Sequence, residues 1–341
     1  MRFQSAALSV VASLVAPAAS IAAGSDNNND GKVVRLLVSH DAGGGYDTYA
    51  RLYGRHVGKH LPGTPSIVVQ NMPGAAGVVM TNYLFTRSAS DGTVIGLAPG
   101  SIATAALFGS AGARYDARDL TWLGSLNSEV AVAVSRGDAP VKTAADLFSK
   151  DLIVGGAGAS DNSVIFANLL NRLFNAKLRL VTGYKGSAEN VLAMERGEVQ
   201  GIAGWSYSSL ITMRPDWVQQ HKINILVQFS LTPHPDLKDV PTILEFARDD
   251  EQRALLKLIF AQASMGRVVF APPRVAADRA KELRDAFDAT LEDPEFKSDA
   301  ERMHIEIVAP LHGAQVDSLV RELYLAPPGR IKEAATAVGG S

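Results

Sequence analysis

Short apolar segments alternate with helical patterns along most of this 341-residue chain, and this alternation constrains the fold more than any other feature. Residues 33–38 read as a buried strand, and a glycine-rich turn and an amphipathic helix over 46–61 follow. Two further strands are predicted at 67–69 and 93–97, with a helix at 77–85 between them. This β-α-β-α-β order favours a parallel sheet with helices on both faces.

The same pattern restarts after Asn127. It predicts strands at 130–134, 152–154, 178–181, 199–203 and 223–229, with helices at 163–174 and 187–196 among them. The last third reads as mostly helical, including one long helix that starts after Pro272-Pro273 and ends near Leu291. Open α/β sheets bind ligands at the carboxyl ends of their strands. The sequence therefore predicts an α/β protein with two open, mostly parallel sheets and a ligand cleft.

The N-terminus has the pattern of an export signal. Arg2 precedes a run of apolar or small residues over 6–19, and small residues follow at 20–23. The run is too short and too rich in alanine to span a bilayer, and it lacks the polar face that a buried helix would need. We predict a signal peptide at 1–23, cleaved after Ala22 or Ala23, and a periplasmic mature protein. Because the chain has no cysteine, a lipidated-cysteine anchor is excluded.

Several functional classes lack their usual signals. The chain has 33 Lys and Arg against 35 Asp and Glu, with no basic cluster typical of nucleic-acid binding. A nucleophile elbow, a phosphate-binding Walker loop and a dinucleotide-binding glycine pattern are all missing. His56 and His60 are four residues apart, but no glutamate follows His56 as in a zinc-protease helix. We expect no catalytic residue, no metal and no cofactor.

Three glycine-rich turns each follow a predicted strand and precede a predicted helix. Glycines let the backbone approach a ligand, and a helix N-terminus presents free N–H groups with a partial positive charge. Such turns suit a carboxylate without a Lys or Arg, although they could also serve only as helix caps. The candidate ligand-binding residues in them are Gly43, Gly44, Gly45, Tyr46, Asp47, Ser101, Ala103, Thr104, Gly158, Ser160 and Asn162.

Two charged or aromatic groups near these turns have alternative interpretations. Trp205 lies at the end of the strand predicted at 199–203, so it is either part of the cleft or part of the core. Arg51 stands four residues after Asp47, and an ordinary helical ion pair between them is the simpler interpretation. We therefore expect backbone amides and hydroxyl groups, rather than Arg51 or Lys185, to hold the ligand.

Five motifs in the same order resemble one known family. They are Gly-Gly-Gly-Tyr-Asp-Thr-Tyr-Ala-Arg at 43–51, Val-Val-Gln-Asn-Met-Pro-Gly-Ala-Ala-Gly at 68–77, Ser-Asp-Gly-Thr at 90–93, Tyr-Lys-Gly-Ser-Ala at 184–188 and Val-Pro-Thr-Ile-Leu-Glu at 240–245. Together they resemble the solute-binding receptors of tripartite tricarboxylate transporters, also called Bug receptors. Ala42 and Gln70 depart from the family's usual proline and glutamate, and Gly204-Trp205-Ser206 lacks its acidic residue.

The resemblance implies a two-lobed periplasmic-binding-protein fold of type II. Lobe 1 would comprise 32–127 and 231–330, and lobe 2 would comprise 128–230. The implied ligand is a small carboxylate (a di- or tricarboxylate, an amino acid or an aromatic acid) held by loop amides, hydroxyls and bridging waters. Tyr184 and Trp205 would contribute from lobe 2.

The implied partners are the membrane permease subunits of such a transporter, and we expect a monomeric receptor. Two alternatives remain open at this stage. The protein could be a ligand-sensing subunit that feeds a sensor kinase, or, with less support, a secreted enzyme.

Overall fold

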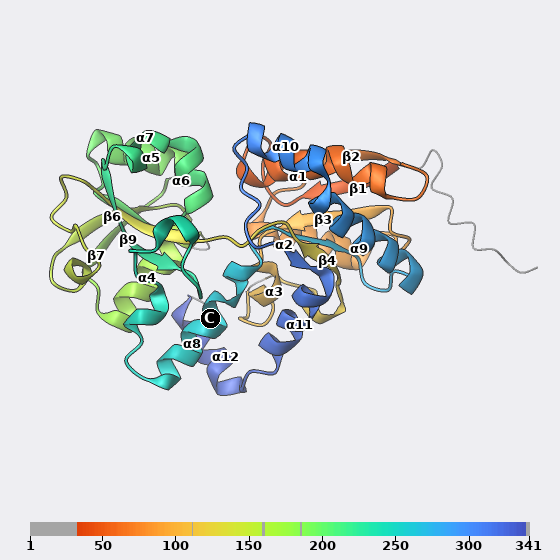
Figure 1. Ribbon diagram of the computed structural model, residues 1–341. Coiled ribbons are helices and arrows are strands. Elements are labelled where there is room, and N and C mark those ends of the chain that lie inside the picture. Colours follow the sequence, from red (N-terminus) through yellow and green to blue (C-terminus); the bar gives the residue numbers. More distant parts are fainter. Residues whose placement is uncertain (1–32, 111, 159–160, 185, 339–341) are drawn as a thin grey trace, which may run out of the picture.

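Two β-sheets form the framework of the molecule, and helices cover them (Figure 1). The computed structural model describes residues 33–338 except 111, 159–160 and 185, so the predicted signal peptide, Ser160 and Lys185 lie outside the described residues. The first sheet has the order β11-β4-β10-β3-β1-β2. Its strands are β1 (Val33–Val38), β2 (Ser66–Asn71), β3 (Val94–Ala98), β4 (Thr121–Ser125), β10 (Val268–Ala271) and β11 (Leu311–His312).

The second sheet is built from one continuous stretch of chain, in the order β7-β6-β8-β5-β9. Its strands are β5 (Ala131–Arg136), β6 (Leu152–Gly156), β7 (Leu178–Thr182), β8 (Gly201–Ser206) and β9 (Ile223–Phe229). The chain thus leaves the first sheet after β4 and returns to it with β10. The lobe boundaries stay a prediction.

The helices connect and cover these strands. The longer ones are α1 (Gly45–Val57), α2 (Val78–Arg87), α4 (Asn162–Phe174), α5 (Ser187–Arg196), α8 (Asp250–Phe260), α9 (Ala277–Glu292), α10 (Pro294–Arg302), α11 (Gly313–Tyr324) and α12 (Pro328–Ala337). The shorter ones are α3 (Ile102–Ala105), α6 (Tyr207–Met213) and α7 (Pro215–Gln219), and η7 (Ala261–Ser264) is a 3-10 turn that continues α8. In the part of the chain that the structure describes, no helix is long and apolar enough to cross a membrane.

Both sheets are mixed, so the expectation of mostly parallel sheets is wrong in this respect. β1 runs parallel to β2 and β3, but β10 lies antiparallel between β3 and β4. In the second sheet β6 runs parallel to β7 and β8, while β5 is antiparallel to β8 and β9. The physical reason is that β10 enters the first sheet from the opposite direction, after the chain has completed the second sheet.

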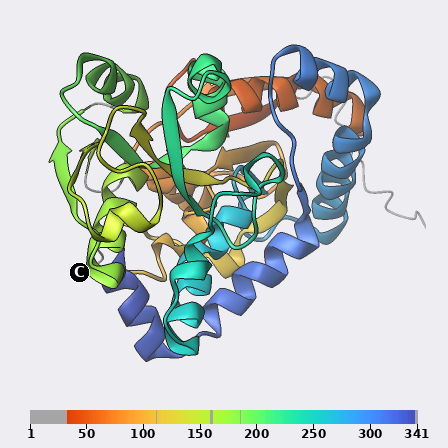
Figure 2. The same ribbon diagram turned by 60° about the vertical axis from the view of Figure 1, so that its left-hand side comes forward.

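An apolar core continues from one sheet to the other. Phe166 of α4 contacts both Phe229 of β9 and Phe260 of α8, at ring-centroid distances of 4.6 and 5.1 Å. The C-terminal helix α12 packs on α8 and on α4, as Figures 1 and 2 show below the two sheets. Elements that flank the two sheets are therefore joined by apolar contacts as well as by the connecting chain.

Candidate functional site

A small cavity lies where the three glycine-rich turns come together. Tyr46 lines it from the first turn, Ser101 from the second and Asn162 from the third. Glu129 and Gln262 complete its polar lining, and Phe166, Phe229 and Phe260 form much of its apolar lining. Three segments that are far apart in the sequence therefore meet at one place, as the topology predicted.

The cavity holds about 60 Å³, which is enough for only a few water molecules. Small-molecule sites usually occupy about 300–1,000 Å³. A ligand of several carbon atoms would therefore need the cavity walls to move apart. A larger hollow of about 370 Å³ is open to solvent between α4 and α12, but no residue of the three turns lines it.

Local sequence explains how each turn reaches the cavity. Gly44 is the N-cap of α1 and makes no side-chain cap, so the first amides of that helix are left for other acceptors. At the second turn, a Cβ on Gly100 would lie 2.2 Å from the carbonyl oxygen of Met265, so glycine permits this close approach. At the third, Asp161 caps α4 by accepting a hydrogen bond from the Ser163 amide at 2.9 Å.

A buried arginine lies beside the first turn, which the sequence did not predict. The Arg267 side chain is 3% exposed, and its guanidinium carbon lies 3.8 Å from the ring centroid of Tyr49 and 5.2 Å from that of Tyr46. A Cβ on Gly45 would be 3.5 Å from its Nη2 atom. A fixed cation therefore stands close to the N-terminus of α1, although it is not among the residues that line the cavity.

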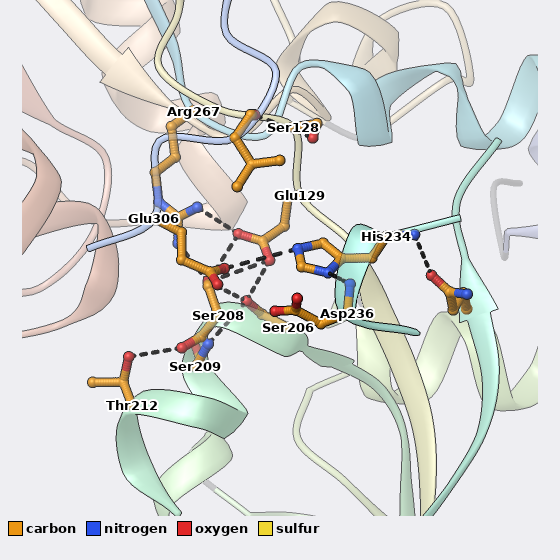
Figure 3. Close-up of polar contacts among 12 residues, drawn as sticks. Ser128, Glu129, Ser206, Ser208, Ser209, Thr212, His234, Asp236, Arg267 and Glu306 are labelled. Atoms are coloured by element: carbon orange, nitrogen blue, oxygen red, sulfur yellow. Dashed lines mark hydrogen bonds and ion pairs between the residues drawn. The ribbon is translucent and has the colours of Figure 1, made fainter. Parts of the chain in front are cut away.

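Glu129 pairs with this arginine and links it to the second sheet. Its carboxylate forms an ion pair with Arg267 Nη1 and accepts a hydrogen bond from Ser206 Oγ at 2.6 Å. Ser208 Oγ lies 3.2 Å from the same carboxylate and 3.3 Å from Arg267 Nη2. Figure 3 shows Glu129 between Arg267 and the two serines. The pair thus connects residues on both sides of the cavity.

More acidic groups surround this pair. His234 Nε2 and Glu306 Oε2 are 4.0 Å apart, and Figure 3 places Asp236 beside them. Burial raises the pKa of Glu306, and the negative charges of Asp236 and Glu129 raise it further. Burial lowers the pKa of His234, which keeps that ring neutral near pH 7. The surroundings of Glu129 are therefore rich in negative charge.

Tyr46 has a fixed position and a fixed protonation state. Its ring stacks on that of His40, with centroids 4.1 Å apart and planes 15° apart. Burial raises the pKa of Tyr46 to about 12, so it presents a hydroxyl group and no negative charge at neutral pH. Burial also lowers the pKa of His40 to about 4. The aromatic side of the first turn is consequently uncharged.

Other predicted residues of the first two turns serve the local structure. Asp47 accepts hydrogen bonds from the Gly43 amide at 2.8 Å and from Arg51 at 2.9 Å, so the expected helical ion pair is present. Burial would raise the pKa of Asp47, but bonds from Arg51, Gly43 and Asn71 outweigh it and lower the pKa to about 2. Ala103 and Thr104 are buried residues of α3, and the Thr104 hydroxyl donates to the carbonyl oxygen of Ser101.

Trp205 lies in the core and does not line the cavity. It is 2% exposed and contacts Trp217 edge to face at 6.2 Å. A bulge at Gly204 explains this position, because Val132 pairs with Trp205 while Ala133 pairs with Ala203. Gly204 has φ +84°, and the extra residue puts Trp205 on the same face of the sheet as Ile202. Regular alternation would have put it on the other face.

The remaining predicted residues also lie outside the cavity lining. Tyr184 packs on the core on the α5 side of the second sheet. Burial raises the pKa of Tyr184, and the negative charge of Glu198 raises it further. Gly158 is exposed. Gly43, Gly44 and Gly45 are exposed at the start of α1. Among the described residues, no group of three or more His, Asp or Glu is arranged to hold a metal ion.

The residues that sequence reasoning missed come from two unpredicted regions. Arg267 immediately precedes β10, and Gln262 lies in η7 just before it. Glu129 lies in the crossing from β4 to β5. The short apolar run Val268-Val269-Phe270 was a signal for a strand and could have revealed the first region, but no local pattern brings Arg267 and Glu129 together.

Comparison with solved structures shows that other proteins share this fold. A TctC solute-binding protein from Polaromonas is 20% identical, with a TM-score of 0.66 over 88% of this chain and 98% of its own. BugD, a periplasmic binding protein, is 20% identical, with a TM-score of 0.62 over 89% of this chain and 95% of its own. MatC from Rhodopseudomonas palustris, solved with malate, is 21% identical, with a TM-score of 0.62 over 89% of this chain and 98% of its own. At such identities the likeness shows the fold, which is that of the two-lobed periplasmic binding proteins.

The family itself is shown by a sequence model. No curated protein sequence matches the chain. The model of the tripartite tricarboxylate transporter family receptor matches residues 50–323, which is well over half of the chain. This family consists of periplasmic solute-binding receptors and not of enzymes. The chain therefore belongs to the tripartite tricarboxylate transporter receptor family, as its five sequence motifs predicted.

Proposed function

We propose that this receptor is exported to the periplasm and captures a small carboxylate in the cavity between the three glycine-rich turns. It then delivers this ligand to the membrane subunits of a tripartite tricarboxylate-type transporter. The observation that carries the proposal is the convergence of Tyr46, Ser101 and Asn162 on one cavity. Export follows from the predicted signal peptide at 1–23. Two structural relatives support the ligand class, because MatC was solved with malate and a second R. palustris protein with adipate.

The chemistry of the cavity suits a carboxylate attached to an apolar chain. Ser101, Asn162 and Gln262 supply neutral polar groups, and the uncapped start of α1 supplies amides beside Tyr46. The three phenylalanines supply apolar surface for methylene groups or a ring. Because the cavity holds only about 60 Å³, binding must be accompanied by movement of the walls. The walls would first move apart to admit the ligand and then close around it, which is the hinge motion common among binding proteins.

A paired substitution on one helix tests this site. Asn162 lines the cavity at the start of α4, whereas Asn168 lies on the same helix outside the lining. Asn162→Ala should weaken carboxylate binding by about tenfold, since a hydrogen bond to a charged group contributes roughly 1.5–3 kcal/mol. Asn168→Ala should leave the affinity unchanged. Isothermal titration against a panel of organic acids gives both values, and equal affinities in the two variants would place the ligand elsewhere.

A further inference from the structure

We propose that Glu129 determines the specificity of this cavity by excluding a second ligand carboxylate and favouring a hydroxyl or ammonium group in its place. The inference rests on the proposed function, because it takes the first ligand carboxylate to bind among the turns. It concerns a residue outside all three turns and outside the five sequence motifs. The preferred ligand would then be a carboxylate whose far end donates a hydrogen bond.

The backbone holds Glu129 firmly at the cavity. Its amide donates to the carbonyl oxygen of Ala263 at 2.8 Å, and the preceding Asn127 carbonyl accepts from Gly266 at 2.9 Å. A Cβ on Gly266 would lie 2.6 Å from the Glu129 Cβ atom, so the two chain segments are in direct contact. Because the side chain is also bonded to Arg267 and Ser206, its carboxylate has a fixed position at this lining residue.

Glu129 supplies a charge that no other lining residue balances. Among the described residues that line the cavity, it is the one with a carboxylate, guanidinium, ammonium or imidazole side chain. Arg267 is its ion-pair partner but is not among the lining residues, and its guanidinium is packed against the rings of Tyr46 and Tyr49. A ligand group that reaches the Glu129 side chain would therefore meet a carboxylate, which can accept hydrogen bonds and cannot donate them.

The neighbouring charges add to this preference. Glu306 and Asp236 lie close to Glu129, while His234 beside them is neutral near pH 7. A second ligand carboxylate would enter this negative region as a further anion. A hydroxyl group would donate to Glu129, and an ammonium group would in addition be attracted by the surplus of negative charge. The apolar surface of Phe166, Phe229 and Phe260 suits the methylene chain between the two ends of such a ligand.

Matched ligands test the proposal on the unmodified mature receptor. Adipate, 6-hydroxyhexanoate, 6-aminohexanoate and hexanoate share one six-carbon chain and differ at the far end, and succinate, 4-hydroxybutanoate and 4-aminobutanoate form a shorter set. Isothermal titration should show that the hydroxy or amino acid binds at least tenfold more tightly than the dicarboxylate of the same length. Comparison of the hydroxy and amino members shows which donor the cavity prefers.

Two variants then assign the preference to Glu129. Glu129→Gln should reduce the tenfold preference to less than threefold or reverse it, because Arg267 is then free to attract the second carboxylate. Glu306→Gln is the comparison variant, since it removes a nearby carboxylate that does not line the cavity, and it should reduce the preference much less than Glu129→Gln does. Because an unpaired Arg267 could destabilise the first variant, Glu129→Gln with Arg267→Met provides a second form in which both charges are absent. Thermal melting confirms that each variant is folded.

The possible failures are distinguishable. If the wild-type receptor binds adipate or succinate more tightly than the matched hydroxy and amino acids, the role of Glu129 is wrong while carboxylate capture stands. The role of Glu129 is equally wrong if Glu129→Gln folds and keeps the tenfold preference. If no acid of either set binds, and a wider panel of organic acids also gives no heat, carboxylate capture itself is wrong and the specificity proposal falls with it.

Discussion

The Arg267–Glu129 pair should be strongly coupled in stability, and a double-mutant cycle measures this. The Arg267 side chain is 3% exposed and that of Glu129 is 17% exposed, so each charge depends on the other for compensation. Removing one partner of a buried pair usually destabilises a protein by about 3–5 kcal/mol. After Arg267→Met, Glu129 would keep hydrogen bonds from Ser206 and Ser208 and some contact with solvent. We therefore expect a loss of about 3 kcal/mol, at the lower end of that range.

The other two corners of the cycle follow from the same contacts. Glu129→Gln should also cost about 3 kcal/mol, because Arg267 would remain charged beside the Tyr46 and Tyr49 rings and Ser208 without a carboxylate partner. The double variant removes both charges, so its loss should not exceed that of the worse single variant. Urea unfolding at neutral pH, followed by tryptophan fluorescence, gives the three free energies. Losses that simply add, or a loss below about 1 kcal/mol for Arg267→Met, would falsify this account of the pair.

Two further predictions concern the turns around the cavity. Because burial holds the pKa of His40 near 4 against an ordinary 6.5, only the unfolded chain takes up this proton between those values. The stability of the wild type should therefore fall as the pH drops from about 6.5 to 4. Between pH 7 and pH 4.5 the wild type should lose roughly 1–2 kcal/mol more unfolding free energy than His40→Gln, as measured by urea unfolding. Gly100→Ala should destabilise the protein by about 3 kcal/mol, because its Cβ would lie 2.2 Å from the Met265 carbonyl oxygen. Gly158→Ala is the control and should change stability by less than about 0.5 kcal/mol, because no atom lies within 4 Å of its Cβ position. Equal melting temperatures of the two variants would contradict this packing.

Local sequence patterns predicted the parts of the site that depend on neighbouring residues. Tyr46 and Ser101 follow β1 and β3 of the first sheet and Asn162 follows β6 of the second, so the order of elements was sufficient to place each residue after the carboxyl end of a strand. The ion pair of Asp47 with Arg51 was equally local, since it spans one helical turn. Such features need no knowledge of how the two sheets face each other.

The features that were missed depend on contacts between distant segments. β10 is only four residues long, and it lies between β3 and β4 although about 170 residues separate it from β3. Arg267 gains its position from this strand, so its meeting with Glu129 had no local signal. Trp205 was ambiguous for a different reason, because a single bulge at Gly204 decided which face of β8 it occupies. A one-residue shift in a strand reverses the face of every side chain beyond it.

The buried cation changes the electrostatic picture of the site without making it a simple cationic one. A free arginine beside the turns would draw in dicarboxylates through long-range attraction, and that attraction would weaken with salt. Arg267, however, is already paired with a carboxylate of the protein and packed between two tyrosine rings. Outside the pair the two charges largely cancel, so selection among carboxylates must occur at contact distance. The neutral polar groups of the turns would then hold the first carboxylate, and the Glu129 carboxylate would discriminate between the groups at the other end of the ligand.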